Sequence, residues 1–121
     1  MHHPIIEHFV NEIRTAKQPC FTTENQVVCG RISITASPSI DSKKLQSLKL
    51  EMPVETQLHE ATYFYMFLVS VFGAETFCDF EPRIKPAMVA TGEFSETIND
   101  WKLRMFIEND SRVVLAEAMS Q

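Results

Sequence analysis

The stretch that decides the fold is Met52–Gly73, with the sequence MPVETQLHEATYFYMFLVSVFG. From Ala61 to Phe72 it contains no charged residue, and only Thr62 and Ser70 interrupt the run of apolar side chains. Apolar residues recur there at helical spacing and extend almost round the whole circumference, so this helix must be buried on most sides. Because the run is shorter than the ~20 apolar residues that cross a bilayer, it predicts a core helix and no membrane partner.

The helix is expected to be capped by Thr56 and to end at Gly73 in the left-handed conformation. An earlier helix is predicted at Pro4–Lys17, where proline suits the first turn and the apolar residues form one stripe. Three segments between the two helices are predicted to be strands from their alternation or their composition: Cys20–Thr23, Val27–Ala36 and Leu48–Met52. In the longest of them, Val28, Ile32 and Ile34 are expected to share one face.

The segments after the long helix predict an antiparallel meander that ends in a hairpin. Thr76–Phe80 and Pro86–Phe94 are expected to be strands because of their aromatic and β-branched residues. Apolar and charged side chains alternate along Trp101–Glu108, a turn is expected at Asn109–Ser111, and Val113–Ala116 continues beyond that turn.

A helix from Thr97 to Met119 is the competing interpretation of this last segment, because it contains good helix formers. On a helix its apolar residues would scatter round the whole circumference. On two strands they sort better, with Phe106 as an exception, so we prefer the hairpin. The chain is therefore expected to be a single α+β domain over residues 1–121, with a long central helix buried against an antiparallel sheet.

Composition narrows the classes of partner. A net charge of −5 argues against nucleic acid and against an anionic membrane surface. The three cysteines, Cys20, Cys29 and Cys78, are odd in number and lack CxxC spacing, so we expect reduced thiols in a cytoplasmic protein and no zinc site. Cys29 and Cys78 are expected to be core residues within strands. The sequence shows no signal peptide, metal-binding loop or phosphate-binding loop, and no cofactor is predicted.

Several segments resemble the 3-hydroxyacyl-[acyl-carrier-protein] dehydratases of the hot-dog superfamily, in which a sheet wraps a central helix. Trp101–Arg104 and Val113–Ala118 look like the closing hairpin of that family. Met52–Pro53 and Glu60–Ala61 look like the entry to its central helix, and Arg83–Pro86 looks like the strand before its meander. The resemblance implies a homodimer with its pocket between protomers, and an acyl carrier protein or coenzyme A thioester as partner.

The resemblance also bears on catalysis. The loop before the helix carries a histidine in the family, but the matching stretch here, Gln46–Glu51, has none. His59 could act as a general base on an acyl chain, and Glu60 could correspond to the family's acidic residue. Neighbouring helix positions point about 100° apart, so the two cannot both face one pocket squarely. The alternative is that both are surface residues of a first helical turn.

The aromatic run of the helix supplies candidate substrate-binding residues. Tyr63, Phe64 and Phe67 could line an acyl pocket, since such pockets are mostly apolar. The alternative for each of them is packing in the core or in a dimer interface.

Two further functions stay open beside an acyl-thioester enzyme or binding protein. The chain is similar to type III secretion chaperones in size, acidity and N-terminal helix, which would make it a dimer that binds an effector polypeptide. That interpretation requires the final segment to be a helix. An immunity or inhibitor protein, whose acidity complements a basic target, is the third.

Overall fold

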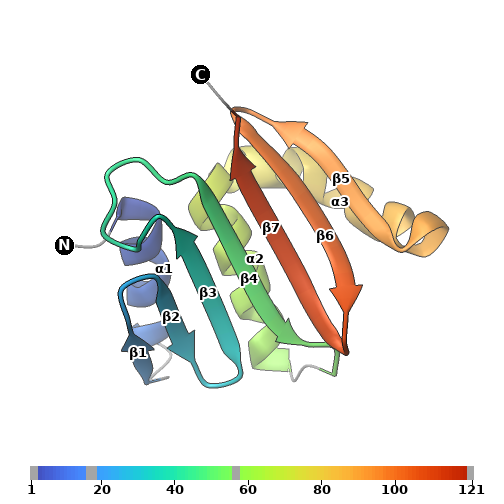
Figure 1. Ribbon diagram of the computed structural model, residues 1–121. Helices are drawn as coiled ribbons and strands as arrows, with labels where there is room; N and C mark the ends of the chain where they lie inside the picture. The colour runs from blue at the N-terminus through green and yellow to red at the C-terminus, as the bar shows by residue number, and fades with distance from the viewer. Residues whose placement is uncertain (1–2, 16–18, 56–57, 120–121) are drawn as a thin grey trace.

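The computed structural model describes residues 3–15, 19–55 and 58–119, without the side chains of residues 14–15 and 58–61. In these ranges seven strands form one antiparallel sheet, and three helices cover one of its faces (Figure 1). The strand order is β1-β2-β3-β4-β7-β6-β5. The elements are α1 (Pro4–Thr15), β1 (Cys20–Thr22), β2 (Gln26–Cys29), β3 (Ile32–Ser37), β4 (Ser47–Pro53), α2 (Leu58–Phe72), α3 (Ala74–Thr91), β5 (Glu93–Ile98), β6 (Trp101–Glu108) and β7 (Ser111–Ala118).

The predicted α+β class, the N-terminal helix and the C-terminal hairpin are confirmed. Strands β6 and β7 pair from Trp101–Ala118 at one end to Glu108–Ser111 at the other. Asn109 and Asp110 form the two-residue turn with φ of 51° and 61°, the left-handed conformation that this kind of hairpin requires. The competing helix over residues 97–119 is therefore wrong.

One predicted strand is two strands. Residues 27–36 were expected to run straight, but Gly30 has a φ of 63° and the chain turns back there, so that β2 pairs antiparallel with β3. Because of this turn, Val28 does not share a face with Ile32 and Ile34, as the prediction of one strand required. Val27 pairs with Ile34 on the helix-covered face, whereas Val28 pairs with Ser33 on the uncovered face.

The strands predicted at residues 76–80 and 86–94 are wrong, because most of this segment is the helix α3. Phe80 is its buried residue, and its ring lies 5.3 Å from that of Phe72 and 6.2 Å from that of Phe94. Pro82 and Pro86 cannot donate backbone hydrogen bonds inside the helix. They stand four residues apart on one exposed side, away from the aromatic contacts.

The long central helix is less isolated than expected. It ends at Gly73, which has a φ of 88°, and α3 follows directly. Thr56, the predicted cap, lies outside the described residues. Helix α2 shares the covered face of the sheet with α1 and α3 (Figure 1), and the rings of Phe67 and Phe9 meet edge to face at 6.2 Å between α2 and α1.

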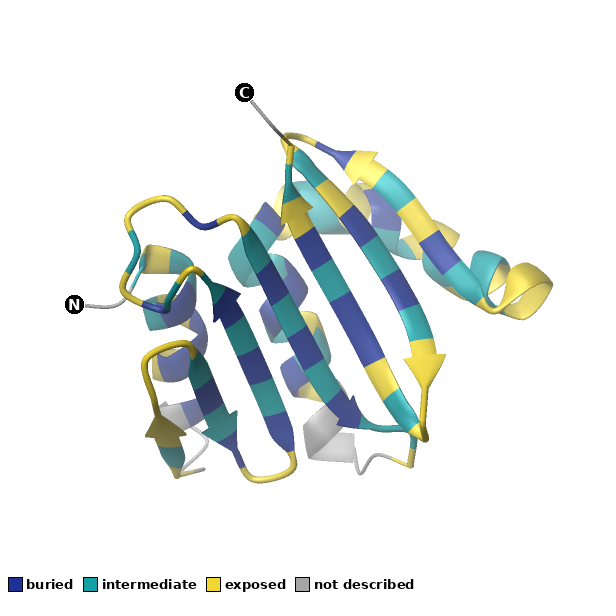
Figure 2. Cartoon of the chain, viewed as in Figure 1, coloured by how far each residue is buried: buried dark blue, intermediate teal, exposed yellow. Residues whose placement is uncertain are grey.

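The core lies between the helices and the sheet. Buried and half-buried residues alternate along the central strands, as Figure 2 shows from the uncovered face. Leu48, Leu50 and Leu103 are fully buried on the covered face, where each contributes on the order of 1.5–3 kcal/mol by leaving water. The uncovered face carries polar and mixed side chains, among them the Lys49–Glu51 ion pair.

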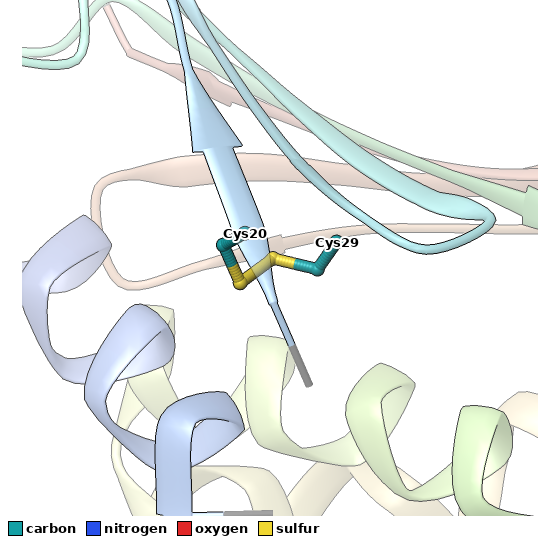
Figure 3. The surroundings of a disulfide bond; sticks show 2 residues. All are labelled: Cys20 and Cys29. Atoms are coloured by element: carbon teal, nitrogen blue, oxygen red, sulfur yellow. A yellow bond between two sulfur atoms is a disulfide. The ribbon is translucent and has the colours of Figure 1, made fainter. Parts of the chain in front are cut away.

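A disulfide joins Cys20 of β1 to Cys29 of β2, so the expectation of reduced thiols is wrong for this pair (Figure 3). The two residues are direct cross-strand partners, and the bridge fastens the three-residue edge strand to the sheet. Cys29 lies in the core, as expected. Cys78 is exposed on α3, contrary to the prediction of a buried strand residue. The cytoplasmic location that was inferred from reduced cysteines loses this support.

Reducing the disulfide is expected to lower the free energy of unfolding by about 2–3 kcal/mol, the loop-closure contribution of a bridge between cysteines nine residues apart. Urea unfolding with and without dithiothreitol measures this difference. The double variant Cys20→Ala/Cys29→Ala should not respond to dithiothreitol, and Cys78→Ala should respond like the wild type. Equal midpoints for the oxidised and reduced wild type would contradict the expectation.

Candidate functional site

A hollow lies between α2, α3 and the sheet, over the turn end of the β6–β7 hairpin. Its volume is about 480 Å³. The side chains around it are mainly aromatic and aliphatic. The lining residues are Phe64, Tyr65, Ile84, Lys85, Met88, Val89, Gly92, Met105, Ile107, Arg112, Val113 and Val114.

The hollow exists because the two helices leave Gly73 in different directions. Helix α2 lies behind β4, whereas α3 leads away toward the β5 edge of the sheet (Figure 1). Near their junction the helices are joined by aromatic contacts, such as that of Tyr65 with Phe77 at 5.7 Å between ring centroids. Farther along α3, Ile84 and Met88 are only half-buried. The second half of this helix therefore packs incompletely on the protein.

Apolar side chains are exposed at the mouth of the hollow. Tyr65 is 45% exposed, Val89 79% and Ile107 53%, and these are three of the five exposed large apolar residues recorded for the described chain. They come from three different elements, α2, α3 and β6. Apolar groups gathered in this way are typical of a ligand or partner site rather than of scattered surface residues.

Two cationic side chains also line the hollow. Lys85 comes from α3 and Arg112 from β7, and both are exposed. In the described part of the chain, neither has a recorded ion pair or hydrogen bond to a carboxylate. The chain as a whole is acidic, with a net charge of −5. The hollow is therefore bordered by positive charge, although the protein as a whole is acidic.

The site residues that were predicted from the sequence lie in different environments in the structure. Phe64 lines the hollow. Tyr63 and Phe67 are 4% and 1% exposed and belong to the core. His59 and Glu60 fall in the first turn of α2, but their side chains lie outside the described residues, so the catalytic assignment stays a prediction.

The residues that sequence reasoning missed come mainly from α3 and the hairpin. Because residues 76–80 and 86–94 were expected to be strands, Ile84, Met88 and Val89 had no predicted place beside the long helix. Arg112 was assigned to neither a site nor a partner. The available signal was the helical spacing of Ile84, Met88 and the intervening Ala87, which was hidden by the two prolines.

A polar cluster on the other side of α3 fastens the helix to β5. The guanidinium of Arg83 donates two hydrogen bonds to the carboxylate of Glu96, with Nε–Oε2 at 2.9 Å and Nη2–Oε1 at 2.8 Å, and a third to the carbonyl of Asp79. The two bonds to its carboxylate, together with the positive charge of Arg83, lower the pKa of Glu96 below its usual range. With its donors engaged in this way, Arg83 is a structural clasp.

A second cluster joins α1 to α2. His8 Nδ1 lies 2.7 Å from Ser70 Oγ, and His8 Nε2 lies 3.8 Å from a carboxylate oxygen of Glu12. The combination is superficially like a hydrolase triad. The Ser70 hydroxyl donates its proton to the carbonyl of Met66, however, at 2.8 Å. Since a hydroxyl has one proton, His8 must then be the donor to Ser70, and the serine is not activated as a nucleophile.

Compared with known proteins, the chain matches no family model, no curated protein and no solved structure. Among the described residues, His, Cys, Asp and Glu side chains do not gather in any group of three that could hold a metal ion. None of the helices, over the ranges that are described, has the length and apolarity needed to span a membrane. The site must therefore be interpreted from its own geometry.

The Arg83–Glu96 clasp should make stability depend on pH. Because the folded pKa of Glu96 lies below its ordinary value of 4.5, the stabilisation is present above pH 4.5 and is lost as the pH falls through the folded pKa. Glu96→Gln should therefore unfold at lower urea concentration than the wild type at pH 7, with the difference narrowing toward pH 3. Glu108→Gln, at an exposed strand end, is the control, and a constant difference for Glu96→Gln would refute the assignment.

Proposed function

We propose that this protein is a binding protein for a ligand with an apolar chain, such as an acyl group, and that the chain lies in the hollow between α2, α3 and the β6–β7 hairpin. The observation that carries the proposal is the apolar lining that remains exposed there. Tyr65, Val89 and Ile107 would each lose water contact on ligand binding. This is favourable by about 25 cal/mol per Å² of apolar surface.

The size and chemistry of the hollow suit a small molecule. Ligand pockets commonly enclose about 300–1,000 Å³ and are lined by apolar side chains with a few polar groups, and the hollow of about 480 Å³ has this character. Met88 and Met105 contribute flexible, polarisable side chains that adapt to chains of different shape. A ligand would also complete the packing of α3, whose second half is poorly covered.

Binding is favoured over turnover by the polar groups that line the hollow. In the described lining these are Lys85, Arg112 and the hydroxyl of Tyr65, with no histidine or carboxylate in general-base position. The acyl-thioester chemistry implied by the hot-dog resemblance would need His59 and Glu60. Hydrolysis of dodecanoyl-coenzyme A that is abolished in His59→Ala would overturn the non-catalytic proposal.

The alternative of a chaperone for an effector polypeptide has lost its helical C-terminal segment. The homodimer stays a prediction. A second copy seated over Val89 would make the mass in sedimentation equilibrium depend on protein concentration, which tests the homodimer.

Val89→Asp is expected to weaken binding of dodecanol by about tenfold or more, because it places a charge beside the bound chain, which must then be desolvated. Isothermal titration calorimetry measures the affinity. Since Val89 is 79% exposed, the variant should keep the wild-type unfolding midpoint.

Ala90→Asp is the matched control, because it adds the same charge one residue along α3 at an exposed position outside the lining. Its affinity should equal that of the wild type. If both variants bind dodecanol as the wild type does, or if the wild type binds no apolar chain, the hollow is not the site.

A further inference from the structure

We infer that the ligand carries an anionic group at the end of its apolar chain, and that Arg112 and Lys85 hold this group at the rim of the hollow. The inference rests on the proposed function, since it assigns the class of ligand for the same site. The shared chemistry is an acyl chain that ends in a carboxylate or a phosphate.

The placement of the two cations supports this inference. Arg112 stands near the start of β7, where its strand partners are Ile107 on β6 and Met52 on β4. Lys85 stands on α3, on the opposite wall. Two positive side chains from elements distant in sequence thus border one apolar hollow. An anion between them would be approached from the sheet and from the helix.

Their lack of partners is the second argument. Two other arginines form ion pairs: Arg83 with Glu96, and Arg104 with Glu93. No such pair is recorded for Arg112 or Lys85 within the described ranges. On a chain with a net charge of −5, two cations without recorded acidic partners provide local charge complementarity for an anionic ligand.

The exposed position of the two cations suits an amphipathic ligand, whose apolar chain is buried while its anionic head stays near water. The apolar chain gains free energy by entering the hollow, whereas an anionic head must stay hydrated or be paired. Arg112 and Lys85 are exposed at the rim, so the head can keep part of its water while it is bound. A guanidinium can also donate two parallel hydrogen bonds to a carboxylate or a phosphate.

The test compares ligands that share a chain and differ in the head. Isothermal titration calorimetry of the wild type with dodecanoate and with dodecanol, below micellar concentrations, isolates the contribution of the anion. We expect dodecanoate to bind about three- to tenfold more tightly at low salt, as for a partly exposed ion pair, and the preference to shrink at higher ionic strength. Dodecanoyl-coenzyme A distinguishes a phosphate-bearing source from a free carboxylate by its relative affinity.

Single-residue variants then show which side chains cause the preference for dodecanoate over dodecanol. Arg112→Gln and Lys85→Gln should each lower the ratio of dodecanoate affinity to dodecanol affinity by about threefold, because each removes one cation from the rim. Lys102→Gln is the control, because it removes the same charge from an exposed position on the uncovered face of the sheet. Its preference should match that of the wild type.

The outcomes separate this inference from the proposed function. Equal affinities for dodecanoate and dodecanol, or a preference that survives in Arg112→Gln and Lys85→Gln, would overturn the anionic head while the apolar site stands. A wild type that binds neither ligand would overturn both. A preference lost equally in Lys102→Gln would assign it to the overall charge and not to the rim.

Discussion

The pairing of β4 with β7 is the interaction on which the rest of the structure depends. Strands β1 to β4 form one meander from the first half of the chain, and β5 to β7 form another from the second half. Seven residue pairs, from Ser47–Glu117 to Pro53–Ser111, join the two into one sheet. The other strand pairs connect neighbours in sequence, whereas this one closes a loop that includes both α2 and α3.

The same pairing positions the core and the hollow. It aligns Leu50 with Val114 and Leu48 with Ala116, so the buried faces of both meanders become one continuous surface for the helices. Helices α2 and α3 connect the two meanders, from the end of β4 to the start of β5, and they lie on that surface. The hollow lies where the second meander extends under α3, and its floor at Met105 and Val114 is supplied by this arrangement.

The sequence predicted correctly those elements whose structure follows from the local order of apolar and polar residues. Alternation along residues 101–108, followed by a polar turn, predicted the hairpin correctly, because one face of each strand is buried and the other is not. The segment 74–91 was misjudged because Pro82 and Pro86 argue against a helix interior. There the packing of Phe80 against Phe72 and Phe94 outweighs local preference, and those partners lie on different elements. The cross-strand disulfide was missed for a different reason. Cys20 and Cys29 lie on the neighbouring strands β1 and β2, but the odd number of cysteines and the lack of CxxC spacing favoured reduced thiols.

The hollow was the least predictable feature, because core residues and pocket residues have the same composition. Consecutive residues of α2 make the difficulty concrete. Tyr63 is 4% exposed, Phe64 is half-buried and lines the hollow, and Tyr65 is 45% exposed at its mouth. A rotation of about 100° per residue separates these environments. From the sequence all three were equally suited to a buried helix that is apolar nearly all round. What distinguishes them is the direction that α3 takes after Gly73, which leaves Tyr65 only partly covered by its contact with Phe77 and leaves Phe64 in the lining of the hollow.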